Sequence, residues 1–325
     1  MTACPFSVAS KQAVQEALSH RHLGVRPPDE PVPTALLATP AQPIFAAMVR
    51  MRDDAVQSEL KAAITRALAT FSDDDIRQTT RDVAARLAAD LVTAEQLTRF
   101  NYALSIGVLA AFLGIPYPDC PDLVDEVLDF VRCIAPGGSA EQMTRGAIAA
   151  GKLQSRMAWA EGPLFHSLCQ QIGDRSLAVA NAIGLFFQAC EGTAGLIGQT
   201  LLMRKECSQT AEDPISRVLQ QTPPIQTTRR FALQDTRLDG QPLLAGQGVL
   251  VHLKTPEASF AFGYGVHQCP GERWARIIAA AGIDYLSVLD SKPELLSHFR
   301  WRASQNARVP EFFTAEERND DCGHF

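Results

Sequence analysis

The most informative stretch of this chain is Phe262-Gly263-Tyr264-Gly265-Val266-His267-Gln268-Cys269-Pro270-Gly271. A single cysteine follows two closely spaced glycines and a histidine, and it precedes a proline, a glycine and a predicted helix. Six positions matter here: a phenylalanine, two glycines, a histidine, the cysteine and a final glycine. With average residue usage, this combination should arise by chance in fewer than about one in 10^5 chains of this length. The stretch therefore indicates a functional loop.

The cysteine of this loop has the environment of a reactive thiol. Cys269 precedes the first turn of a predicted helix, where free N–H groups and the helix dipole favour a thiolate. Pro270 suits the first helical position, because the N–H that it lacks would have no intrahelical partner there. A thiolate is able to ligate haem iron and to donate electron density to it. The residues alone indicate an activated thiolate in a glycine-rich loop.

Three other interpretations of the loop are weaker. A dinucleotide-binding loop would need a third glycine at the correct spacing after Gly263 and Gly265, and none is present. A zinc site would need a second cysteine close by. A buried structural cysteine is the third alternative, because free cysteines are usually inert.

The loop resembles the cysteine-ligand loop of the cytochromes P450, FxxGxHxCxG, with every position of the motif filled. This resemblance implies haem b (iron protoporphyrin IX) as the cofactor and Cys269 as the iron ligand. It implies that Phe262 shields the sulfur, that Gly265 and Gly271 let the backbone lie flat against the haem, and that His267 reaches a propionate. It also implies a mainly α fold with a small β subdomain, an abbreviated form of the cytochrome P450 fold.

A second segment, Phe187–Gly195 (FQACEGTAG), resembles the long central helix of that family. Thr193 matches the threonine that assists proton delivery, and Glu191 is the nearest acid. In the family the acid directly precedes the threonine, where this chain has Gly192. We expect Thr193 and Glu191 to be catalytic, with a helix bulge at the glycines bringing them together. The alternative for Thr193 is a buried threonine bonded to its own helix backbone.

Three further residues match propionate-binding positions of the family. Arg230 follows Pro223-Pro224 as the family arginine does, with Arg229 as the alternative. Gln57 and Lys61 occupy the positions of a family histidine and arginine four residues apart. Both can donate to a carboxylate, but lysine lacks the bidentate geometry of arginine. The alternative for Gln57 and Lys61 is an ordinary solvated helix face.

The chain also departs from the family pattern. At the positions of the ExxR pair it reads Arg217-Val218-Leu219-Gln220, and only about eight residues separate Leu253 from Phe262. The two losses are consistent, because a buried charge without its partner costs several kcal/mol. The segment 142–189, which we expect to cover the substrate pocket, is shorter than the corresponding segment of the family. Such a protein has either an open haem face or an incomplete, dimer-completed or inactive site.

Composition excludes several classes of protein. The chain has 325 residues, a net charge of −6 and no block of basic residues, so we expect no nucleic-acid partner. The longest apolar stretch, Ala103–Tyr117, is too short to span a membrane, and the first residues lack a secretory signal. Eight cysteines without regular spacing do not form a disulfide framework, so we expect a cytoplasmic protein whose Cys133, Cys169, Cys190 and Cys207 are small packing residues.

We expect one domain over residues 1–325. It comprises an extended lead-in (1–50, proline-rich from Arg26 to Pro43), a helical part (51–222), and a β part with the cysteine loop and its following helix (223–325). Helical spacing covers residues 54–90, with Ser72 as a cap, and Asp239-Gly240 marks a hairpin turn within 230–253. Further helices are predicted at 94–114, 121–134, 140–158, 163–172, 175–205, after Pro214 and at 271–289, with a second hairpin at 299–313.

The leading functional hypothesis is a monooxygenase of a small organic substrate that uses dioxygen and external electrons from a ferredoxin and ferredoxin reductase. The first alternative is a haem-thiolate enzyme that uses peroxide or needs no redox partner. The second alternative is a non-catalytic haem-binding or sensor protein.

Overall fold

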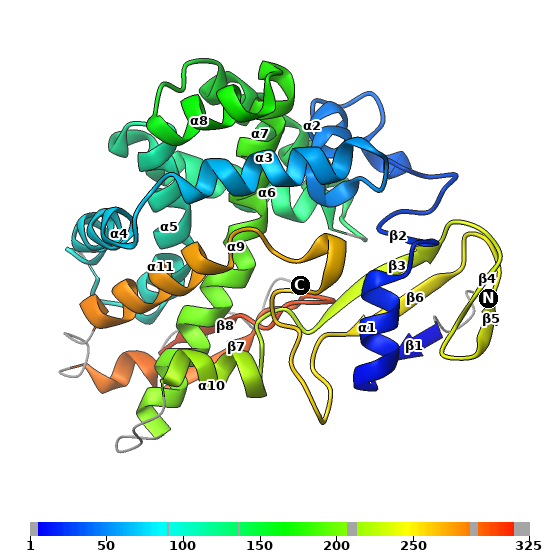
Figure 1. Ribbon diagram of the computed structural model, residues 1–325. Helices are drawn as coiled ribbons and strands as arrows, with labels where there is room; N and C mark the ends of the chain where they lie inside the picture. The colour runs from blue at the N-terminus through cyan, green and yellow to red at the C-terminus, as the bar shows by residue number, and fades with distance from the viewer. Residues whose placement is uncertain (1–5, 90, 136, 207–212, 287–291, 315–325) are drawn as a thin grey trace.

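The computed structural model describes residues 6–89, 91–135, 137–206, 213–286 and 292–314. A large helical body makes up one side of the molecule and a small sheet the other, with the cysteine loop between them (Figure 1). The predicted mainly α fold with a small β part is confirmed. The helices are α1 (Lys11–Ser19), α2 (Ala41–Ala47), α3 (Val56–Ala69), α4 (Asp73–Ala88), α5 (Ala94–Leu113), α6 (Cys120–Ile134), α7 (Ala140–Ala158), α8 (Pro163–Ile172), α9 (Arg175–Glu206), α10 (Pro214–Gln221) and α11 (Glu272–Tyr285).

The predicted helices between residues 54 and 221 are confirmed. Ser72 ends the first helical stretch and begins the next, because its hydroxyl accepts a hydrogen bond from the backbone N–H of Asp75. The Asp75 carboxylate accepts from the Ser72 N–H in return, so the two residues form a capping box. The helix after the cysteine loop ends at Tyr285 and not at 289; residues 287–291 and Cys207 lie outside the described residues.

The prediction of an extended lead-in over residues 1–50 is wrong in two places. Helix α1 begins after Ser10, whose side chain accepts from the Ala13 N–H, and it buries Val14 and Leu18. Helix α2 begins at Ala41 although Pro43 follows. Pro43 lies in the first turn, where its missing N–H breaks no intrahelical hydrogen bond.

The β part consists of one four-stranded sheet and two hairpins. In the sheet, the order is β1-β6-β3-β2, with β1 parallel to β6 and the other pairs antiparallel. The predicted turn at Asp239-Gly240 is confirmed, since both residues have positive φ (50° and 73°), as a two-residue hairpin requires. The predicted C-terminal hairpin is also confirmed. The strands are β1 (Phe6–Val8), β2 (Leu23–Gly24), β3 (Thr227–Ala232), β4 (Thr236–Leu238), β5 (Gln241–Leu243), β6 (Gly248–His252), β7 (His298–Trp301) and β8 (Pro310–Phe313).

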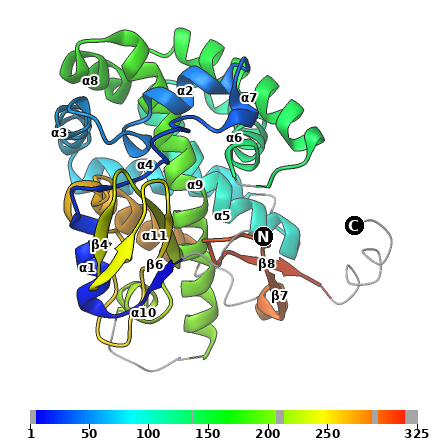
Figure 2. The same cartoon turned by 90° about the vertical axis from the view of Figure 1, so that its right-hand side faces the viewer.

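Helix α9 runs through the centre of the molecule (Figures 1 and 2). It packs against α5 and α11 on its flanks and against α10 near its C-terminal end. The helix is continuous from Arg175 to Glu206, with α-helical hydrogen bonding on both sides of Gly192. The predicted bulge is therefore absent. Gly195 serves a different purpose, because an added Cβ there would lie 2.7 Å from the Arg308 carbonyl oxygen of the segment that leads into β8.

Candidate haem-thiolate site

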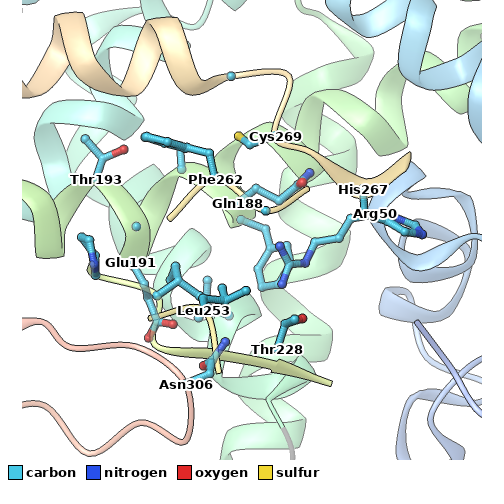
Figure 3. A pocket seen from close by; sticks show the side chains of 18 of the residues that line it. Arg50, Gln188, Glu191, Thr193, Thr228, Leu253, Phe262, His267, Cys269 and Asn306 are labelled. Atoms are coloured by element: carbon cyan, nitrogen blue, oxygen red, sulfur yellow. The ribbon is translucent and has the colours of Figure 1, made fainter. Parts of the chain in front are cut away.

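A cavity of about 1350 Å³ lies between the cysteine loop, α9 and strand β3. Figure 3 shows Cys269 and Phe262 on one side of this cavity and Leu253, Thr228 and Asn306 across it. Pockets for one small molecule usually measure about 300–1,000 Å³. The cavity thus has room for a large planar cofactor together with a substrate.

Backbone hydrogen bonds fix the shape of the cysteine loop. The Cys269 N–H donates to the Phe262 carbonyl oxygen at 2.8 Å, and the Gly263 N–H donates to the carbonyl oxygen of Phe260 at 2.8 Å. Gly263 has a φ of +74°, which L side chains rarely adopt. The guanidinium of Arg276 lies over the Phe262 ring, 5.3 Å from its centroid, and packs on that ring from α11. These contacts hold the loop in a conformation in which Cys269 lines the cavity.

The protonation of Cys269 differs from the expectation. Burial raises the pKa of the Cys269 thiol, although the Gly271 N–H and the Arg50 charge lower it. The side chain has accessible surface, and Cys269 lines the cavity. The helix start alone therefore does not produce the thiolate. A bound metal ion does, because a coordinating thiol loses its proton.

The two glycines that we assigned to the haem have different surroundings. Gly271 lines the cavity, and an added Cβ there would lie 3.9 Å from the Cys269 sulfur. Gly265 does not line the cavity. Its φ is +66°, and an added Cβ would lie 3.3 Å from the Leu18 carbonyl oxygen of α1. This glycine lets the loop pack against α1, and its role toward the haem stays a prediction.

Of the predicted propionate-binding residues, Arg230 and His267 both line the cavity. His267 Nε2 lies 3.2 Å from Asp53 Oδ1; burial lowers the pKa of His267, and Asp53 partly offsets this. Arg230 is 4% exposed. Its Nη1 donates to the Thr228 hydroxyl and to the Arg229 carbonyl oxygen, neither of which is charged. Burial and the Arg50 charge lower the pKa of Arg230 to about 10.

Gln57 and Lys61 also line the cavity, but they have a different contact from the one expected. Both side chains donate to the Val266 carbonyl oxygen, Gln57 Nε2 at 3.3 Å and Lys61 Nζ at 2.5 Å. They connect α3 to the cysteine loop. Their role toward a propionate stays a prediction.

The sequence analysis missed Arg50. It lies in the 3₁₀ turn Val49–Met51, directly before α3, and its side chain lines the cavity. Burial lowers the pKa of Arg50, and the nearby Cys269 opposes that shift. No motif or spacing in the sequence singles out this arginine among its neighbours, so only the fold reveals it.

Thr193 and Glu191 both line the cavity, but the structure does not bring them together. Thr193 is 2% exposed and lies near Phe262, whereas Glu191 lies farther from Cys269 (Figure 3). Glu191 Oε1 lies 3.3 Å from Nη1 of Arg302, which also donates to the Tyr102 hydroxyl at 3.1 Å. Because α9 is undistorted, Glu191 is held in this ion pair and away from Thr193.

The positions of the missing ExxR pair are bridged in another way. The Ser259 hydroxyl, in the short segment before the cysteine loop, donates to the Leu219 carbonyl oxygen of α10 at 2.5 Å. This hydrogen bond ties α10 to the loop segment. The 142–189 segment supplies Asn181, Leu185 and Phe187 to the lining of the cavity, and α6 adds Val131 and Ile134 to it.

The residues present fit a haem. A cysteine lines a cavity of sufficient size, and two arginines of the same lining, Arg50 and the buried Arg230, form no ion pair with a carboxylate among the described residues, which suits a group with two carboxylates. No cluster of three His, Cys, Asp or Glu side chains that would suit a bare metal ion occurs in the described ranges. The fold and this site fit a haem-thiolate protein.

Comparison with known proteins agrees with this class. No family model matches the chain. Cytochrome P450 CYP105Q4 of Mycobacterium marinum is 24% identical over 262 residues, which cover 68% of this chain and 62% of the relative. Among solved structures, P450BioI in complex with a hexadecenoic-acid-ligated acyl carrier protein has a TM-score of 0.79 at 19% identity, covering 95% of this chain and 91% of that one. CYP109E1 from Bacillus megaterium in complex with testosterone has a TM-score of 0.70 at 18% identity, with 94% and 90% covered.

The chain has the fold of the cytochrome P450 superfamily and its complete cysteine-loop motif, and it is similar to a curated member of that superfamily. Proteins of this superfamily bind haem b, which the residues described above fit. The chain spans 62% of the length of the curated relative that it matches. Among the described residues, no helix has the length and apolar character needed to cross a membrane.

Proposed function

We propose that this protein is a haem-thiolate monooxygenase that hydroxylates, or oxidises in a related way, a small organic substrate. The observation that carries the proposal is that Cys269 and Thr193 line one cavity whose volume exceeds the needs of a cofactor alone. When bound, haem with a thiolate ligand supplies oxygen activation, because the thiolate favours O–O cleavage. The protein supplies the ligand, the propionate-binding cations and the walls of the substrate site.

The proposed substrate is largely apolar. The parts of the cavity away from the cysteine loop are formed by aliphatic side chains, including Val131, Ile134, Leu185 and Leu253. Similar structures hold a fatty acyl group on its carrier protein and testosterone, so this fold accepts substrates of that size. The proposed electron donors are a ferredoxin and its reductase, as the family resemblance implies.

Within this function, the role proposed for Thr193 is to hold a proton-bearing group above the haem. Its hydroxyl lies on the wall of the cavity, in a helix that packing on both flanks keeps in place. Glu191 is not proposed as its direct partner in the arrangement described. The proton then reaches Thr193 from water or from a group on the substrate.

A second candidate is peroxide-driven oxidation by the same haem-thiolate site. The ion pair between Glu191 and Arg302 favours it, because this acid is not free to relay protons to Thr193. Peroxide brings both oxygen atoms and two protons, so it lessens the demand on a protein relay.

The test is a reduced carbon-monoxide difference spectrum followed by turnover assays with a panel of fatty acids and steroids. The proposal expects a thiolate-type Soret band, and product formation that needs NAD(P)H with ferredoxin and reductase. Product formed only when peroxide is supplied would support the second candidate. A haem-loaded protein that forms product under neither condition would contradict both.

A further inference from the structure

We infer that Arg50 binds one of the two propionate carboxylates of the haem, and so replaces the cation that α3 does not provide. The inference rests on the haem of the proposed function. Its test measures how firmly the cofactor is held, which does not require turnover.

The surroundings of Arg50 indicate an anionic ligand. Its side chain lines the cavity next to the cysteine loop. The side chain has accessible surface, and desolvation by the surrounding protein is the main cause of its lowered pKa. Over the described ranges, no carboxylate, carbonyl or hydroxyl group of the protein forms a hydrogen bond or ion pair with the Arg50 guanidinium. A guanidinium in such a place is unfavourable unless a ligand supplies the negative charge.

Arg230 is the second cation without a carboxylate partner in the lining of this cavity. Its printed hydrogen bonds go to uncharged oxygen atoms of Thr228 and Arg229, and the charge of Arg50 contributes to lowering the pKa of Arg230. Two arginines of the cavity lining, one of them buried, therefore repel each other. Haem carries two propionates, and one on each arginine would remove both the repulsion and the missing hydrogen bonds.

The other cations around the cavity already have partners. Lys61, at the position of the family arginine, already donates a hydrogen bond to the Val266 carbonyl oxygen. Several arginines that line the cavity are each paired with a carboxylate. These pairs are Arg26–Glu30, Arg132–Asp129, Arg300–Glu311 and Arg302–Glu191.

Compared with the family pattern, the proposed propionate-binding cation lies eleven residues earlier in the chain, at Arg50 instead of Lys61. In the family pattern the arginine lies within the helix, at the position of Lys61, whereas here it lies in the turn that leads into α3. The turn is fixed from behind, because the Val49 N–H donates to Asn181 Oδ1 of α9 at 2.8 Å. Arg50 is thus a positioning residue for the cofactor on a backbone that α9 holds.

The test compares haem with haem dimethyl ester, in which both propionates are methylated, in the full-length protein and its R50Q and R50K variants. The release rate to excess apomyoglobin is measured for each. We expect R50Q to release haem about 10- to 100-fold faster than the unaltered protein, the size of one charge-assisted hydrogen bond. We expect R50K to lie between them. For the ester, R50Q and the unaltered protein should agree within about twofold, since the carboxylate is gone.

The matched control is R132Q, which removes a cavity arginine that Asp129 already neutralises, and it should leave both release rates unchanged. An equal acceleration of haem and ester release by R50Q would overturn the inference, because it would show that Arg50 only supports the fold. Equal release of haem and ester from the unaltered protein would overturn it as well, even if R50Q does not fold. A protein with Arg50-dependent haem retention but no oxidation products would contradict the proposed activity and support this inference.

Discussion

Nη1 of Arg302 lies 3.3 Å from Oε1 of Glu191, and this contact joins the end of the β7 segment to the middle of α9. It holds the only acid near the family position in an ion pair on the cavity wall; the family position itself is Gly192. Glu191 and Thr193 are two positions apart in the sequence, but we expect only Thr193 to take part in proton delivery.

Thr193→Ala and Glu191→Gln should have unequal effects. We expect Thr193→Ala to retain haem but to divert most of the electrons from product to peroxide, because the hydroxyl proposed to hold the proton-bearing group is lost. Glu191→Gln should change this coupling by less than about twofold, since Arg302 holds the acid away from Thr193. The measurement is product formed per NAD(P)H consumed. A larger loss with Glu191→Gln than with Thr193→Ala would show that the ion pair opens during turnover.

Cys269→Ser should abolish the thiolate-type Soret band and most of the haem retention, because no other cysteine among the described residues lines the cavity. Cys169→Ser is the matched control: this half-buried cysteine of α8 does not line the cavity, and its replacement should preserve the spectrum. The reduced carbon-monoxide spectrum of both variants is the readout. Loss of the band in Cys169→Ser would place the ligand elsewhere.

Gly146→Ala should destabilise the protein strongly. An added Cβ would lie 2.0 Å from Cys133 Cβ, so α6 and α7 would have to move apart, with an expected loss of about 1–3 kcal/mol in the free energy of unfolding. Gly192→Ala is the control on another helix, where an added Cβ meets nothing within 4 Å. Here we expect a gain of about 0.5–1 kcal/mol from helix propensity. Chemical denaturation of the two variants measures both changes.

Ser259→Ala should remove the hydrogen bond that ties the loop segment to α10. The Leu219 carbonyl oxygen then loses this donor, and we expect the free energy of unfolding to fall by about 1 kcal/mol. Ser155→Ala, which removes an exposed hydroxyl that bonds only to its own helix at Gly151, should change stability by less than about 0.5 kcal/mol. Equal values for the two variants would indicate that the loop is held by packing alone.

Much of the helical part could be predicted because its signals are local. Ser72 and the three acids after it define a helix start within five residues, and Asp239-Gly240 defines a turn by the conformation that these residues accept. The cysteine loop is local in the same sense, since its roles follow from a contiguous motif. These parts depend little on the rest of the chain.

The remainder could not be predicted because it depends on contacts between distant segments. Arg50 faces Cys269 only after the turn before α3 packs against α9, and the Glu191–Arg302 pair joins two segments that share no pattern. Gly265 was assigned to the haem because the loop motif contains it, whereas its neighbour is the Leu18 carbonyl oxygen. In each case the sequence does not show which distant segment packs against the residue in the folded protein.

The parallel pairing of β1 with β6 has a consequence for biosynthesis. Phe6 aligns with Val249. Strand β1 therefore cannot form this pairing until the ribosome has synthesised the chain as far as β6. Closing so long a loop is slow, and α1, against which Gly265 packs, depends on the same sheet for its place. The cysteine loop, which follows β6 in the chain, can therefore complete its packing against α1 only after this pairing has formed, and we expect haem capture to come late in folding.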